Sequence, residues 1–331
     1  MPQQVGPVDD TGKQGPNPYH EGRHLIVAAR ALTYADESRI HESSNVCLVA
    51  GYRASPGQWK VFEKDWRAVL SKPEYRIKCF HSKVFFNRKV IPAGSGNPYS
   101  RWSEIKAKRF LGELLMVIAR RQLAPVGCAI DIKDWKALSF GERSILAGYT
   151  SNRFGRRHHL ANPQPYHLAF RVTLEDAAHG TDPNTQLQFT FAEQGQYEQR
   201  AYECWDLTKS HCPLPYVDQL TYLGFASPLK YVQLQAADLY ARSWYNYFAR
   251  EGQGLNDENW MALKMLNRRR PTILYCDADG MERIFRSGSI TDESCQQVRE
   301  SDEVHELVTK TLAEAKAKYG WTDKDLKNAA R

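Results

Sequence analysis

The order of strand-like and helix-like segments along the 331-residue chain most constrains its fold. Two early segments are expected to be strands: 31–38, which ends in acids, and 45–54, which is rich in β-branched and small apolar residues. From about residue 100 onward, amphipathic segments with helical periodicity alternate with further strand-like segments. Strands first, followed by alternating helix and strand, predict a mixed α/β sheet flanked by helices on both faces.

The first helix has a clear start signal. Ser55 is a suitable N-cap, Pro56 follows at the first helical position, and Val61, Phe62, Trp66 and Leu70 are expected to line the apolar face. The next segment, 75–82, is expected to be a third strand. Later helices are expected at about 102–122, 165–178, 197–209 and 231–248, and later strands at 125–135, 186–194, 220–227 and 271–276.

Composition places the chain among ordinary globular proteins, with 42% hydrophobic and 25% charged residues. The formal net charge of +7 modestly favours an anionic partner such as nucleic acid. Seven scattered cysteines without a Cys-x-x-Cys pair, and no signal-like apolar stretch after Met1, favour a cytoplasmic location. No apolar run approaches the roughly 20 residues that span a bilayer, so no membrane segment is expected.

Three regions are expected along the chain. Residues 1–24 are rich in Gly, Pro and Gln and predict a disordered N-terminal tail. Residues 25–250 hold the alternating pattern and predict the main domain. Residues 251–331, where the pattern weakens, predict a C-terminal extension that is mainly helical.

Four acids fall where a shared site is expected. Asp36, Asp131 and Glu193 lie at the ends of predicted strands, and Asp238 interrupts an apolar helix. Strand ends at one edge of an α/β sheet converge, and carboxylates brought together repel one another. A divalent cation relieves that repulsion, and Mg²⁺ prefers carboxylate and water oxygens. Two such ions, about 3.5–4 Å apart, can clamp the attacking and leaving oxygens of a phosphodiester.

Two motifs resemble the signature ends of the DUF3800 family: "YADES" at 34–38 and "PLKYVQLQAADLYA" at 228–241. The segments "GYRASPGQWKVFEKDW" and "FHS" between them also match, and the resemblance extends over about residues 25–248. Its most specific part is the "LQ-x-AD" helix. The resemblance implies a ribonuclease H-like fold and a metal-dependent nuclease that uses Mg²⁺ or Mn²⁺.

The resemblance also implies roles for particular residues. Asp36, Glu193 and Asp238 are expected to hold metal, and Asp131 is expected to complete the catalytic set. Supporting roles are expected for Glu37, His81 and Gln235. One departure is Arg39, which stands where the family usually has glycine, and this bulky cation could alter how substrate approaches.

Each of these residues also has a purely structural interpretation. Asp238 could pair with Arg242 four residues further along the helix. Asp36 and Asp131 could cap turns, and Glu193 could cap a following helix. His81 could lie on the sheet surface, and Gln235 could bond a neighbouring loop rather than orient Asp238. The aromatic residues of the last predicted helix could pack in the core rather than stack on bases; these are Tyr240, Trp244, Tyr245 and Tyr247.

Two basic stretches, 153–159 and 267–271, are candidates for phosphate contacts, with Arg153, Arg156 and Arg157 as the nucleic-acid-binding residues. Such stretches can equally be solvated loops. "HEGRH" at 20–24 matches a zinc-protease pattern, but Pro18 and Gly22 argue against the long helix it needs.

The favoured hypothesis is a Mg²⁺- or Mn²⁺-dependent nuclease acting on DNA or RNA. The alternative is a non-catalytic binding module within a larger assembly, and a protein partner or homo-oligomer stays open.

Overall fold

The computed structural model describes residues 29–38, 44–91, 96–147, 163–193, 198–211, 216–250, 255–266, 273–287 and 310. The tail 1–24, the "HEGRH" motif, Arg39 and both basic stretches, with Arg153, Arg156 and Arg157, lie outside these residues. The predictions made for them therefore stay predictions.

The described strands form a six-stranded mixed sheet in the order β5-β4-β1-β2-β3-β6. β1 runs parallel to β4 and antiparallel to β2, β4 and β5 are parallel, and β3 is antiparallel to β2 and parallel to β6. Among these strands, β2 alone runs against the others. Their bounds are β1 (Arg30–Ser38), β2 (Val46–Ala54), β3 (Ala124–Asp131), β4 (Gln186–Ala192), β5 (Leu220–Ala226) and β6 (Leu274–Cys276).

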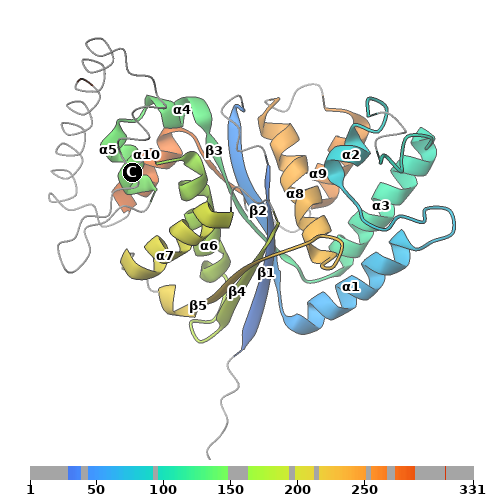
Figure 1. Cartoon of the computed structure of the whole chain (residues 1–331), viewed down its shortest axis with the longest axis horizontal. Coiled ribbons are helices and arrows are strands. Elements are labelled where there is room, and N and C mark those ends of the chain that lie inside the picture. The colour runs from blue at the N-terminus through green and yellow to red at the C-terminus, as the bar shows by residue number, and fades with distance from the viewer. Residues whose placement is uncertain are drawn as a thin grey trace, which may run out of the picture.

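Helices cover both faces of the sheet, as the sequence predicts (Figure 1). One layer contains α1 (Pro56–Leu70), α2 (Ser82–Phe86), α3 (Glu104–Arg120), α8 (Gln233–Phe248) and α9 (Asp257–Leu266). The other contains α4 (Ile132–Ala137), α5 (Phe140–Leu146), α6 (Pro165–His179), α7 (Glu198–His211) and α10 (Ala278–Ser287). A short 3₁₀ turn, Val217–Gln219, precedes β5.

Each helix layer encloses its own hydrophobic core, because side chains alternate between the faces of a strand. Tyr34 of β1 belongs to the core beneath α1, α3 and α8, whereas the next residue, Ala35, belongs to the core beneath α6. Tyr240 and Trp244 are buried in the first core, with the Tyr240 ring 4.8 Å from that of Tyr52. For these two aromatic residues, the core-packing interpretation is confirmed.

The start of α1 is confirmed in detail. Ser55 is the N-cap, its hydroxyl accepts a hydrogen bond from the Gln58 amide, and Pro56 is the first helical residue. The apolar face is only partly as expected: Phe62 is buried, but Val61 is 41% exposed. Trp59, three residues before Phe62, is buried and takes part in that face because i and i+3 positions lie together on a helix.

The strand predicted at 75–82 was wrong. The segment contains turns and leads directly into α2. Two of the backbone donors that a neighbouring strand would need are used by side chains of α8: the Phe80 amide donates to Gln235 Oε1 at 3.0 Å, and the Ser82 amide donates to Asp238 Oδ2 at 2.7 Å. Alternating apolar residues there reflect burial of Ile77 and Phe80 against the helix layer.

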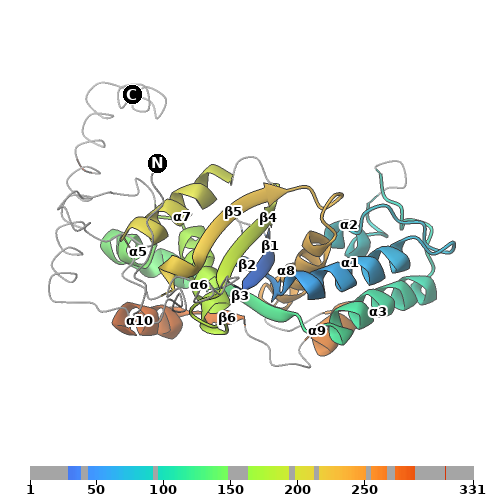
Figure 2. The ribbon, with the colours of Figure 1, turned by 90° about the horizontal axis from the view of Figure 1, so that it is seen from below.

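The described part of the C-terminal segment is integrated with the rest of the molecule. β6 extends the sheet beside β3, α9 packs on α3 and α8, and α10 contacts α5 on the opposite face (Figure 2). The segment after residue 250 therefore contributes a strand as well as helices. Within the described ranges, no helix has the length and apolar character required to cross a membrane.

Candidate functional site

A cavity of about 1170 Å³ opens where β1 and β4 end, and we call it the carboxyl-edge cavity. β1, β4 and β5 are parallel, so their carboxyl ends meet at one edge of the sheet. The lining includes the ends of β1 and β4, the continuous segment 76–84, residues of the segment 96–99, the turn at 227–229 and two residues of α8. Asp36, Glu193 and Asp238 all line it, so the structure brings together three of the four predicted acids in one cavity.

Asp36 faces the helix layer that contains α8. Because Tyr34 lies in the core on that side and Ala35 in the opposite core, the alternation of β1 directs Asp36 toward α8. The residue is 8% exposed and lines the cavity. α8 packs across β1 and β2, which accounts for the shared face of Asp36 and Asp238.

The Asp238 carboxylate is held by the start of α2. Ser82 donates twice, from its amide to Oδ2 at 2.7 Å and from its hydroxyl to Oδ1 at 2.5 Å. His81 Nδ1 lies 3.1 Å from Oδ2. Because an ionised carboxylate can only accept hydrogen bonds, Nδ1 carries the proton in this contact. These donors stabilise an acid whose side chain is only 16% exposed.

His81 caps α2 and lines the cavity, with 56% of its side chain exposed. The hydrogen bond to Asp238 raises the pKa of His81 above its ordinary value, against the opposing effect of partial burial. The imidazole is therefore oriented by Asp238 rather than lying free on a sheet surface.

Gln235 supports the site from within the core. It is fully buried, and its Oε1 accepts hydrogen bonds from Trp66 Nε1 at 2.9 Å and from the Phe80 amide at 3.0 Å. Its amide donates to the Pro228 carbonyl at 2.7 Å. These contacts tie α8 to α1, to the segment before α2 and to the turn after β5, and Gln235 does not line the cavity.

Glu37 points to the opposite face of the sheet from Asp36, because neighbouring residues of a strand alternate between its faces. Tyr166 of α6 donates its hydroxyl to Glu37 Oε1 at 2.8 Å, whereas the buried Oε2 has no hydrogen-bond partner among the described residues. Burial raises the pKa of Glu37 from 4.5 to about 7, although the Tyr166 hydrogen bond acts in the other direction. Glu37 also contributes to the cavity wall.

Asp131 is not brought to the cavity. It ends β3 and caps α4, with Oδ1 accepting from the amides of Lys133 at 2.8 Å and Asp134 at 3.0 Å. Its Oδ2 accepts from the Tyr275 hydroxyl at 2.9 Å. These contacts match the interpretation of Asp131 as an acid that caps a turn.

Glu193 directly follows β4 and is exposed at the cavity. Its amide donates to the Ala226 carbonyl at 3.2 Å, which continues the pairing of β4 with β5 by one residue. α7 is described from Glu198 onward, and residues 194–197 lie outside the described residues, so the interpretation of Glu193 as a helix cap stays a prediction.

Asp36, Glu193 and Asp238 share a cavity, but their carboxylates do not form a preorganised metal site. In the part of the chain that the structure describes, no three His, Cys, Asp or Glu side chains are grouped closely enough to hold a metal ion. Any ion here would therefore take much of its coordination from water or from a ligand.

Sequence reasoning missed several residues of the site. Ser82 lies in the "FHS" motif, but the sequence does not identify it as a partner of Asp238, because that contact joins positions 156 residues apart. Arg76, Lys78 and Lys83 also line the cavity. The regular placement of Arg76 and Lys78 around the buried Ile77 is a signal that could have been found.

Comparisons with models of protein families, with curated proteins and with solved structures gave no match to this chain.

Proposed function

We propose that the carboxyl-edge cavity binds nucleic acid and hydrolyses a phosphodiester bond with Mg²⁺ or Mn²⁺. The observation that carries this proposal is the convergence of Asp36, Glu193 and Asp238 on one cavity. Exposed cations line the same cavity, so a negatively charged ligand has favourable contacts despite the acids.

The sheet topology supports a ribonuclease H-like fold as part of this proposal. The first five strands lie in the order β3-β2-β1-β4-β5, β2 alone is reversed, and α8 crosses β1 and β2. This is the arrangement we expect of a ribonuclease H-like sheet, with β6 added beside β3.

The residues present fit a hard divalent cation that is only partly held by protein. Mg²⁺ is usually bound through one or two carboxylates, with waters and substrate phosphates completing its shell. Asp36, Glu193 and Asp238 supply carboxylates of this type. An ionised carboxylate offers about four acceptor positions, and Asp238 uses three for Ser82 and His81.

Each of these residues would have a distinct role in holding the ion. Asp36 and Asp238 would hold the ion from the sheet and from α8, Glu193 would approach from β4, and Ser82 would fix the orientation of the Asp238 carboxylate. A bound ion of this kind supplies an activated water and neutralises charge on the phosphate.

A non-catalytic binding module is the second candidate. The observation in its favour is that the Asp238 carboxylate already has three hydrogen-bond contacts from Ser82 and His81. A structural carboxylate that clamps α2 onto α8 would show the same contacts. A nucleic acid or a protein partner would then be bound without cleavage.

The test is a cleavage assay on single- and double-stranded DNA and RNA with Mg²⁺, Mn²⁺ or EDTA. We expect metal-dependent cleavage that EDTA abolishes, and that Asp36→Asn and Asp238→Asn each abolish while retaining a cooperative thermal transition. Asp206→Asn is the matched control, because Asp206 is an exposed acid on α7 away from the cavity. Calorimetric titration with Mn²⁺ gives an independent measure of ion binding.

The outcomes separate the candidates. Binding of an oligonucleotide without cleavage in either metal supports the binding module. Cleavage that survives in Asp238→Asn rules out the proposed role of this acid. Absence of both binding and cleavage by the wild-type chain rejects the nuclease and the nucleic-acid-binding module, and leaves a module that binds a protein partner.

A further inference from the structure

One wall of the carboxyl-edge cavity is a basic segment that runs from the turn after α1 into α2. Arg76, Lys78 and Lys83 line the cavity and are exposed, whereas Ile77 between the first two is 6% exposed and packs in the core. The apolar residue anchors the segment, and the neighbouring cations are presented at the cavity. We call these three residues the basic rim.

Within the described part of the chain, the side chains of the basic rim are not paired with other residues. No side-chain hydrogen bond or ion pair joins any of its three cations to another residue of the described ranges. Other cations of the same helix layer do have carboxylate partners, among them Arg67, Lys72, Arg88, Lys89, Lys108 and Arg121. The cavity is thus lined by cations whose charge is available to a ligand.

The backbone at Arg76 is a second, independent feature of this wall. With φ of 50°, Arg76 is the one non-glycine residue of the described chain in the left-handed region. The turn is fixed by bonds from the Arg76 amide to the Lys72 carbonyl and from the Ile77 amide to the Leu70 carbonyl, both at 2.9 Å. Glycine is the usual residue in such a position after a helix, because a side chain is disfavoured there.

We propose that the basic rim binds the phosphate backbone of a nucleic-acid strand and guides it to Asp36 and Asp238. This inference rests on the proposed function and adds which residues would hold the nucleic-acid strand in the cavity. Phosphate contacts from lysine and arginine position a nucleic acid without reading its sequence. The cavity, at about 1170 Å³, exceeds the roughly 300–1,000 Å³ of pockets for small molecules, which favours an extended ligand.

Binding of fluorescein-labelled single-stranded DNA, single-stranded RNA and duplex DNA would be measured by fluorescence anisotropy at rising NaCl. The full chain would be used with EDTA and, separately, with Ca²⁺. The rim variant replaces Arg76, Lys78 and Lys83 by glutamine. The control variant replaces Lys60, Lys64 and Lys136 by glutamine, since these lysines are also exposed and their loss changes the net charge equally, but they lie outside the cavity.

We expect the rim variant to bind single strands more weakly and to lose about two units of the slope of log K against log salt, since each phosphate contact contributes roughly 0.7. The control variant should keep the wild-type slope. A similar loss for DNA and RNA is expected, because the contacts are to phosphate. If the rim variant loses affinity only for duplex DNA, the basic rim binds double-stranded ligands. That result would overturn the proposal that it guides a single strand to Asp36 and Asp238.

The inference can fail separately from the proposed function. If the rim variant keeps the wild-type slope but the wild-type chain cleaves, the basic rim is wrong and the nuclease stands. If the wild-type chain binds through the rim without cleaving in Mg²⁺ or Mn²⁺, the rim stands and the nuclease fails. Equal loss in the rim and control variants, or no binding by the wild-type chain, overturns the rim.

Discussion

The Asp238 carboxylate shows how a single acid is accommodated within a buried helix. Burying a charge is costly unless hydrogen bonds replace the lost water. Here the Ser82 amide, the Ser82 hydroxyl and the His81 ring supply those bonds from one short segment. The acid therefore joins α8 to α2 and still presents part of its surface to the cavity.

The Ser82→Ala variant tests the strength of this junction. Removal of the hydroxyl leaves the amide bond in place but takes one donor from a charged acceptor. We expect the free energy of unfolding to fall by about 1.5–3 kcal/mol, as for other hydrogen bonds to charged groups. Urea unfolding would measure it. Ser71→Ala is the control, because the exposed Ser71 hydroxyl bonds only backbone carbonyls, and an equal loss there would contradict a special role for Ser82.

Glu37 predicts a pH dependence of stability. Its pKa rises from 4.5 to about 7 on folding, so the folded state binds the proton more tightly. The resulting stabilisation is present below pH 4.5 and is lost as the pH rises through about 7. We expect a loss of about 3 kcal/mol across this window, by the conversion of roughly 1.4 kcal/mol per pKa unit.

The Glu37→Gln variant should lack this contribution, and urea unfolding at several pH values would measure the difference. Asp176 has a pKa raised to about 6, so it also makes the free energy of unfolding depend on pH. Its contribution cancels in the comparison, because both the wild-type chain and Glu37→Gln contain it. Parallel pH profiles for the two proteins would show that Glu37 does not titrate in this range.

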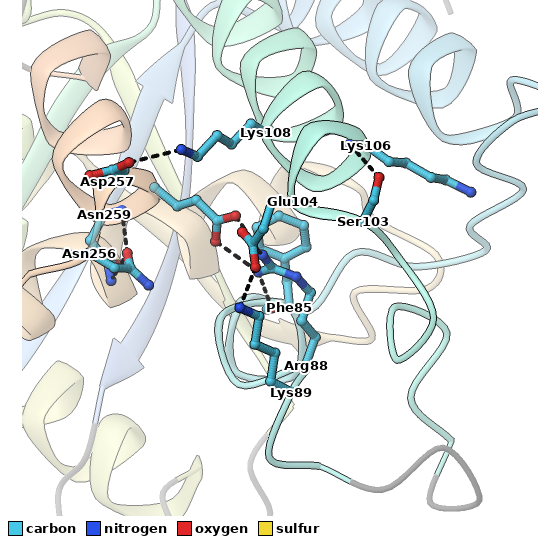
Figure 3. Close-up of polar contacts among 11 residues, drawn as sticks. Phe85, Arg88, Lys89, Ser103, Glu104, Lys106, Lys108, Asn256, Asp257 and Asn259 are labelled. Carbon is cyan, nitrogen blue, oxygen red and sulfur yellow. Dashed lines mark hydrogen bonds and ion pairs between the residues drawn. The ribbon is translucent and has the colours of Figure 1, made fainter.

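The short helix α2 is fixed at both of its ends. Its start holds Asp238 through Ser82 and His81. Just beyond its end, Arg88 joins the helix layer (Figure 3). Arg88 is 5% exposed and makes two bonds to Glu258 of α9, at 2.6 and 2.8 Å, and one to Glu104 of α3, at 2.8 Å. α9 therefore reaches the site indirectly, by fixing the element that clamps Asp238.

The Glu258→Gln variant is expected to weaken this fixation. Removing the Glu258 charge leaves buried Arg88 with the half-exposed Glu104 as its remaining carboxylate partner, so we expect the free energy of unfolding to fall by about 3 kcal/mol. Hydrogen exchange of the segment 81–86 should also become faster. Asp257→Asn is a close control, because it breaks an exposed pair between α9 and α3, Asp257 with Lys108, and should change neither measurement. Unchanged exchange at 81–86 in Glu258→Gln would separate α9 from the site.

The elements that sequence predicts well are those whose local signals agree with their packing. β1, β2, the start of α1 and α8 are confirmed because residue type, periodicity and caps point to one structure. The segment 75–82 was mispredicted, since its amides bond side chains of α8 that lie over 150 residues away. The sequence predicts that Asp36 and Asp238 share a site. It does not reveal Ser82 as a partner of Asp238, because that contact also depends on residues far apart in the sequence.

At the scale of the whole molecule, the C-terminal segment completes both cores. Leu263 of α9 belongs to the core beneath α8, and Cys276 of β6 belongs to the core beneath α6. Cys128 of β3 lies beside it, with the two sulfur atoms 3.7 Å apart. The sheet and both helix layers thus depend on residues beyond 250.

A chain ending after Arg250 is therefore expected to lose cooperative folding, because apolar surface on both faces of the sheet is uncovered. Circular dichroism during heating and gel filtration would show a broad or absent transition and aggregation. A chain ending after Ser287 retains α9, β6 and α10 and is the matched comparison. A sharp transition in the shorter chain would show that the first 250 residues fold independently.

The left-handed turn at Arg76 has a consequence for laboratory evolution. Replacement of a non-glycine residue by glycine in such a turn relieves strain of about 1 kcal/mol. A screen of random variants for heat resistance alone should therefore enrich Arg76→Gly. The same variants would lose a cation of the basic rim, so a second screen for oligonucleotide retention should remove them. Opposite enrichment at this one position would reveal that the arginine is kept for its ligand rather than for the fold.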